Sequence, residues 1–407
     1  MSSGLYVAYG AIASMALLPI YYGSFNSITK LKGPERKKTK FFQEYSDSED
    51  SDDEEAEGLT TQDAYMYPVY GSATLLSLYL VLKYFNVDYV NMLMTVYFSV
   101  AGIGALAHTL VTIAKGTTNI KLPLYYLSLV HKQKEQFLIK FTKLHLITLG
   151  LSTVLTGLYF LLEKNWILSN LIGLAFSFGA IKLMKLESFK TGIIMLMGLF
   201  FYDIFWVFGT EVMVSVAKNL DAPIKLLFPK DILNTPGIFG LKPIKSFVML
   251  GLGDIVIPGI YIALCLRFDR SQYLKKVGYV PKQPLPSVLK GKSKGFKFET
   301  PYFNTCFVAY IFGLITTVFV MHTFKAAQPA LLYLSPACTL STIILAAARG
   351  ELSDFFAYTE EFLPEEGKTV SPNPQKSSRT NNKDDLDVNE KYSSVKANSS
   401  KKSRKDE

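Results

Sequence analysis

The chain has 407 residues, of which 49 % are apolar and 19 % charged, and its formal net charge is +9. The apolar residues are concentrated in runs of about twenty, the length that a helix needs to cross roughly 30 Å of hydrocarbon, which excludes an arrangement of two or three soluble domains. Lys and Arg gather in loops between these runs, where they set membrane topology, so the net charge does not indicate a nucleic-acid partner. The three cysteines have neither CxxC nor Cys/His ligand spacing.

Nine apolar runs are predicted to be membrane-spanning helices, because lipid offers the backbone no other hydrogen-bond partner. They cover residues 4–26, 66–85, 89–114, 144–162, 166–184, 190–210, 244–266, 301–322 and 326–348. The predicted fold class is therefore an all-α polytopic membrane protein with nine transmembrane helices.

Loop charge predicts the orientation of these helices. No basic residue precedes the first run, whereas Lys and Arg are dense between residues 30 and 40. The positive-inside rule then places the N-terminus in the lumen and the first loop in the cytosol. Alternation makes 115–143, 185–190, 267–300 and the C-terminal tail cytosolic. The loop 211–243, predicted to be lumenal, carries both signs of charge and agrees least with this orientation.

The chain divides into five expected regions. These are the first transmembrane helix at 1–26, a cytosolic loop at 27–65, transmembrane helices 2–5 at 66–184, transmembrane helices 6–9 at 185–363 and a cytosolic tail at 364–407. The acidic segment 43–57 and the tail are too polar to bury a core, so both are predicted to be disordered. Basic residues four and three positions from the C-terminal end resemble a retrieval signal for the endoplasmic reticulum.

Only two carboxylates lie well inside a predicted span, Asp203 in the sixth and Asp254 in the seventh. An ionised carboxylate at the bilayer centre costs at least about 2–3 kcal/mol. The two spans are antiparallel neighbours, and at about 1.5 Å per residue both acids lie roughly 10–15 Å from the same face. If the two helices pack, the carboxylates are therefore expected at similar depth.

A carboxylate pair suits hydrolysis, because two close carboxylates cannot both ionise and so share one proton. The ionised member takes a proton from water while the protonated member donates to the scissile carbonyl. Water attacks, and the resulting diol collapses to expel the amine. This chemistry requires no metal, no cofactor and no covalent intermediate. Tyr202, beside Asp203, either donates a hydrogen bond at the pair or is one of the many aromatic residues of the spans.

Two further segments accompany the acids. Gly251-Leu252-Gly253 directly precedes Asp254, and its glycines remove side chains from one helix face, so that another helix or an extended peptide can approach. Ordinary helix packing explains the glycines alone about as well. Gln328-Pro329-Ala330-Leu331 opens the ninth span, where a proline is also unremarkable by itself.

Taken together, Tyr202-Asp203, Gly251-Leu252-Gly253-Asp254 and Gln328-Pro329-Ala330-Leu331 resemble the signature of the GxGD intramembrane aspartyl proteases. That family contains the presenilins and the signal peptide peptidases, and the surrounding residues look more like the latter. The resemblance implies nine spans with a lumenal N-terminus in the membrane of the endoplasmic reticulum. It also implies cleavage, within the bilayer, of remnant signal peptides and of type II or tail-anchored membrane segments.

The same resemblance assigns roles to residues. Asp203 and Asp254 carry over as the catalytic pair, with Tyr202 and Gly251-Leu252-Gly253 as active-site support. Gln328-Pro329-Ala330-Leu331 carries over as the segment that shapes the site and holds substrate. The expected partners are membrane-spanning peptides and the lipid bilayer. Self-association is implied, without obligate partner subunits.

Two other classes of function use similar residues. A transporter or channel relays protons or binds cations with buried acids, but it predicts inverted repeats, which the sequence lacks, and leaves the third motif unexplained. A non-catalytic scaffold would bind membrane segments without cleaving them. Zinc chemistry is not supported because no His-Glu-x-x-His occurs, and neither is a Gly-x-Ser-Gly nucleophile.

Overall fold

A computed structural model describes residues 3–29, 57–118, 124–131, 134–162, 165–220, 223–230, 246–279, 297–324 and 328–360. The acidic segment up to residue 56 and the tail 364–407, both predicted to be disordered, lie outside the described residues. All described residues belong to one of the two units of the chain, residues 1–362.

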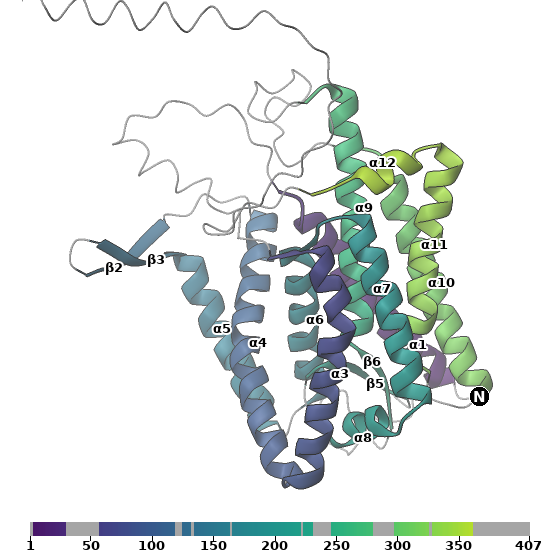
Figure 1. The fold of residues 1–407 in the computed structure, drawn as a ribbon. Helices are drawn as coiled ribbons and strands as arrows, with labels where there is room; N and C mark the ends of the chain where they lie inside the picture. The colour runs from purple at the N-terminus through teal and green to yellow at the C-terminus, as the bar shows by residue number, and fades with distance from the viewer. Residues whose placement is uncertain are drawn as a thin grey trace, which may run out of the picture. The chain divides into compact units, whose positions relative to one another are not determined.

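Among the described residues, eight helices are long and apolar enough to cross a membrane (Figure 1). They are α1 (Ser3–Asn26), α3 (Thr61–Tyr84), α4 (Val87–Thr118), α5 (Lys143–Leu161), α6 (Trp166–Leu183), α7 (Phe189–Asp203) with the π-helix η1 (Ile204–Phe208), α10 (Pro301–Phe324) and α11 (Leu331–Arg349). This confirms the predicted all-α polytopic fold class.

The seventh predicted span, 244–266, is not helical throughout. Phe247–Gly251 forms strand β6, and helix α9 (Gly253–Val277) begins only afterwards. β6 pairs antiparallel with β5 (Lys225–Pro229). The prediction of a helix from residue 244 was therefore wrong, because a short apolar run does not distinguish a strand from a helix.

This strand and helix together still have the length of a membrane crossing. β6 covers about 16 Å at the rise of a strand. The apolar part of α9, up to Leu266, adds about 21 Å at the rise of a helix. The seventh crossing can thus be made by a strand followed by a helix.

Smaller elements lie mostly between the predicted spans. β1 (Glu57–Leu59) pairs parallel with β4 (Met184–Leu186). β2 (Leu124–His131) and β3 (Lys134–Thr142) form an antiparallel hairpin between α4 and α5 (Figure 1). α8 (Val212–Asn219) follows η1, and α12 (Leu352–Ala357) follows α11.

Helix α9 occupies the centre of the helix packing. Every side chain from Ile260 to Leu266 is at most 1 % exposed. The helix packs against α1, α6, α7, α10 and α11. Enclosure by other helices explains how α9 tolerates charge just beyond its apolar part, where Arg267 donates to Glu360 at 2.7 Å. The helix that carries Asp254 is therefore shielded from lipid along most of its apolar length.

Candidate active site

Helix α7 ends at Asp203. Its N-terminus is capped by Ser188, whose hydroxyl accepts from the backbone N–H of Thr191 at 3.2 Å. After Asp203 the chain continues as the π-helix η1, a rare conformation that is frequent at functional sites. The Asp203 side chain is only 4 % exposed. The first acid thus lies buried where the helical geometry changes.

Asp254 lies in the first turn of α9, directly after β6. The backbone N–H of Leu252 still donates to Ile224 beside β5, and the carbonyl of Leu252 then accepts from Val256 to start the helix. Asp254 is half-buried. Its carboxyl group is close enough to that of Asp203 for the two to interact electrostatically. The structure therefore brings the two acids together from separate helices.

The residues before Asp254 are arranged differently from the sequence expectation. Gly251 belongs to β6, so the prediction that Gly251 and Gly253 share a helix face was wrong. A Cβ atom on Gly251 would lie 3.4 Å from Oδ2 of Asp254, so a side chain there would be in van der Waals contact with the carboxylate. Gly253 is exposed, and a Cβ atom there would lie 4.0 Å from Cδ1 of Ile257. Leu252 packs against Gly173 of α6.

Tyr202 faces α3. A Cβ atom on Gly71 of that helix would lie 3.5 Å from the Tyr202 ring, and the ring of Trp206 lies 6.3 Å away, measured between centroids. Trp206, in η1, donates from Nε1 to the hydroxyl of Ser72 at 3.0 Å. These contacts fix the Asp203 end of α7 against α3. A hydrogen bond from Tyr202 to the acids stays a prediction.

The third motif lies at the start of α11. Ala330 is the N-cap of that helix, and Gln328 and Pro329 directly precede it. Ala330 and Leu331 are 4 % and 5 % exposed and belong to the same apolar cluster as Ile255, the neighbour of Asp254. The structure therefore buries Pro329, Ala330 and Leu331 in the same core as the neighbour of the second acid.

Helix α10 connects Asp254 with the third motif through Tyr310, which sequence reasoning did not single out. The hydroxyl of Tyr310, 0 % exposed, donates to the backbone carbonyl of Asp254 at 3.3 Å. One turn later on α10, a Cβ on Gly313 would lie 3.3 Å from the Cα of Leu334 in the first turn of α11. Neighbouring positions of one helix thus contact both Asp254 and the turn that follows the third motif.

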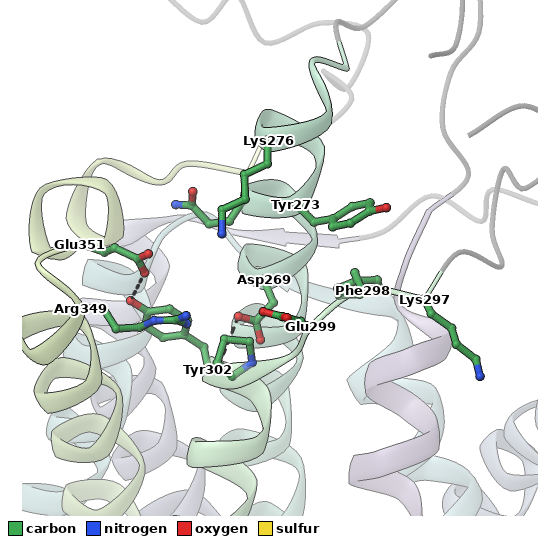
Figure 2. A pocket seen from close by; sticks show the side chains of 11 residues that line it. Asp269, Tyr273, Lys276, Lys297, Phe298, Glu299, Tyr302, Arg349 and Glu351 are labelled. Carbon is green, nitrogen blue, oxygen red and sulfur yellow. Dashed lines mark hydrogen bonds between the residues drawn. The ribbon is translucent and has the colours of Figure 1, made fainter. Parts of the chain in front are cut away.

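A separate pocket of about 560 Å³ lies where α9, α10 and α11 approach one another beyond their apolar parts (Figure 2). Asp269 accepts there from the backbone N–H groups of Tyr302 and Phe303 at 3.2 and 2.9 Å, and so caps α10. The Tyr302 hydroxyl donates to Glu351 at 2.8 Å (Figure 2). None of the predicted site residues lines this pocket. These contacts indicate a structural junction of three helices.

The fold and the interacting acids define a polytopic membrane protein with a carboxylate pair inside its helix packing. Comparison with known proteins is consistent with this. The model of the signal peptide peptidase family matches residues 51–362. The signal peptide peptidase of Mus musculus is 42 % identical over 394 residues, covering 95 % of this chain and 92 % of the mouse protein.

Two other relatives extend this comparison. The signal peptide peptidase of Homo sapiens is 42 % identical over 374 residues, covering 90 % of this chain and 87 % of the human protein. Intramembrane protease 2 of Caenorhabditis elegans is 51 % identical over 200 residues, covering 49 % of this chain and 40 % of that protein. The chain belongs to the signal peptide peptidase family. It is an intramembrane protease, and its substrates are membrane segments in a lipid bilayer.

Proposed function

We propose that this protein is an aspartyl endopeptidase that hydrolyses peptide bonds within the membrane, using a water molecule activated between Asp203 and Asp254. The observation that carries the proposal is that these two carboxyl groups, on α7 and α9, lie within range of electrostatic interaction inside an apolar environment. Membership in a family of intramembrane proteases supplies the reaction that such a pair serves.

The pair performs both proton transfers of the reaction. One carboxylate accepts a proton from water while the protonated partner donates to the scissile carbonyl oxygen. A tetrahedral diol forms. As its C–N bond breaks, the carboxyl group that took the proton from water gives it to the leaving amine, and the other carboxylate takes a proton from a diol hydroxyl, so the pair returns to one shared proton. Tyr310 supports Asp254 by holding its backbone carbonyl. The buried surroundings of Asp203 keep bulk water from competing for these hydrogen bonds.

The substrate must be unwound, because a helical peptide bond is enclosed by its own turns. Strand β6 offers a surface for an extended peptide next to Asp254. The backbone N–H of Lys230 donates to the carbonyl of Ser246, and that of Leu252 donates to the carbonyl of Ile224. Hydrogen-bonded and non-hydrogen-bonded pairs alternate along an antiparallel ladder, so Met249 belongs to a non-hydrogen-bonded pair, and its backbone N–H and C=O groups point away from β5. Such an edge can pair with an added strand. The exposed backbone of Gly253 continues this path toward the acid.

The substrates are remnant signal peptides and type II or tail-anchored membrane segments, and the enzyme lies in the membrane of the endoplasmic reticulum. The relatives of matching length are named for signal peptides. The loop charges support a lumenal N-terminus and a cytosolic C-terminus. A transporter or a non-catalytic scaffold has less support, since neither accounts for membership in a peptidase family.

The test is cleavage of a signal-peptide-like substrate by the purified protein in detergent, without added subunits. Asp203→Ala and Asp254→Ala should each abolish cleavage, and Asp254→Glu should fail too, because one methylene moves the carboxylate by more than about 1 Å. Asp269→Asn is the matched control, since Asp269 is a buried acid on the same helix as Asp254 but caps α10. Cleavage that persists in either alanine variant would refute the assignment of the pair.

A further inference from the structure

Helix α6 contacts strand β5 through three residues on one face. Trp166, Asn170 and Gly173 are spaced four and three positions apart, so they lie in line along the helix. The ring of Trp166 lies 5.6 Å from that of Phe228, measured between centroids. A Cβ atom on Gly173 would lie 3.4 Å from the side chain of Leu226, so the strand approaches the helix closely. Asn170 lies between these two contacts.

The side chain of Asn170 makes two hydrogen bonds to a single residue of β5. Its Nδ2 donates to the carbonyl of Leu227 at 2.7 Å, and its Oδ1 accepts from the backbone N–H of Leu227 at 2.8 Å. Asn170 is 4 % exposed, so these bonds are shielded from water. An amide that both donates to and accepts from one residue reproduces the pattern of a neighbouring strand.

The sheet register shows which edge Asn170 occupies. Leu227 lies opposite Met249, and the bonds from Lys230 to Ser246 and from Leu252 to Ile224 make this a pair whose backbone groups point away from each other. The N–H and C=O of Leu227 therefore face α6, where Asn170 satisfies both. Asn170 thus closes the outer edge of β5, whereas in the described part of the chain no third strand pairs with the outer edge of β6.

We propose that Asn170 is a positioning residue of the protease, which holds the β5–β6 pair in register and thereby sets the place of Asp254 relative to the bound peptide. This inference rests on the proposed function. A two-stranded sheet is only marginally stable by itself, and a slip of one residue would turn every side chain to the opposite face. β6 ends two residues before α9 begins, so a displaced strand displaces the first turn of that helix and Asp254 with it.

The test compares Asn170→Leu, which removes both bonds to Leu227 at similar volume, with Asn170→Asp, which keeps the acceptor but loses the donor; both variants also lose the weak contact of Nδ2 with Sδ of Met15 at 3.8 Å. Ser177→Ala is the matched control, because Ser177 is a buried polar residue of α6 whose hydroxyl bonds to Gly173 within its own helix at 3.0 Å. The first measurement is hydrogen exchange of the peptide that contains residues 223–230 in the full-length protein. The second is mass spectrometry of the products from a single-span substrate, with kcat and KM.

We expect Asn170→Leu to accelerate exchange of the Leu227 amide by roughly tenfold, with a smaller change in Asn170→Asp and none in Ser177→Ala. Cleavage should spread from the wild-type bond to neighbouring bonds, and kcat should fall by up to roughly 100-fold. A role in folding alone would lower the amount of active enzyme without moving the cleavage position.

Two results would overturn the inference. One is unchanged exchange in Asn170→Leu, and the other is accelerated exchange with the same cleavage position and kcat. If Asn170→Leu does not fold, Asn170→Asp decides between the same outcomes. If the wild-type protein cleaves nothing, the proposed function fails, and the exchange measurement alone then decides whether Asn170 holds β5.

Discussion

Gly192→Ala tests how closely the two acid-bearing helices must pack. Gly192 lies in the first turn of α7, and a Cβ atom there would lie 2.6 Å from Cδ2 and 3.0 Å from Cε2 of Tyr261 on α9. The Tyr261 ring cannot easily yield. It is 0 % exposed, its hydroxyl bonds to Thr342 at 2.8 Å, and the ring of Phe189 packs against its edge. The added methyl group must therefore push α7 and α9 apart.

The change in stability of Gly192→Ala is the sum of two opposing contributions. Replacing a helical glycine by alanine gains up to about 1 kcal/mol, whereas overpacking a filled core costs about 1–3 kcal/mol. Gly150→Ala on α5 isolates the first term, because nothing lies within 4 Å of a Cβ atom there. Thermal unfolding in detergent should therefore rank Gly150→Ala above Gly192→Ala by about 1–3 kcal/mol.

The same variant should affect catalysis, because moving α7 from α9 separates the two acids. We expect kcat of Gly192→Ala to fall by up to roughly 100-fold, measured with a single-span peptide substrate. Activity and stability equal to those of Gly150→Ala would show that the helices do not approach as the structure has them. If the double variant Gly192→Ala/Tyr261→Leu partly recovers kcat, the loss in Gly192→Ala has a steric origin.

Two further predictions concern the surroundings of Asp254. Tyr310→Phe removes the donor to the Asp254 carbonyl at 3.3 Å, so kcat should fall up to roughly tenfold with KM unchanged. An unchanged kcat in steady-state assays would contradict that role. Asp269→Ala removes the cap of α10 and should lower the free energy of unfolding by about 1–2 kcal/mol. Asp269→Asn keeps an acceptor, so thermal unfolding should show a smaller loss of stability than in Asp269→Ala. Equal losses of stability in the two variants would argue against a capping role.

Sequence reasoning predicted most of the helices because the membrane imposes a simple rule. A run of about twenty apolar residues in lipid has few alternatives to a helix, and eight of the nine predicted runs form such helices in the described part of the chain. The acids were found for the same reason, since a carboxylate stands out inside an apolar run. The electrostatic interaction of Asp203 with Asp254 is what the expectation of similar depth leads one to find.

The supporting residues were harder to find. Tyr310 is one of 24 tyrosines, and nothing in its local sequence reveals that its hydroxyl reaches a backbone carbonyl 56 positions away. Asn170 offered a stronger signal, because an amide inside an apolar span needs a partner. Its partner, Leu227, lies in a strand that only the folded chain forms. Long-range hydrogen bonds of single polar residues leave no periodic pattern in a sequence.

The misassigned strand nevertheless had little effect on the predicted depth of Asp254. A helix from residue 244 would place the acid about 15 Å from the start of the span at the rise of a helix. β6 starts three residues later but advances about 3.3 Å per residue, so its five residues cover about the same distance. A strand and a helix therefore place Asp254 at similar depth, but they direct the backbone groups before it differently. A strand can offer an unpaired edge to a peptide and a helix cannot. The presence of a strand before Asp254 therefore determines how a substrate can approach this acid.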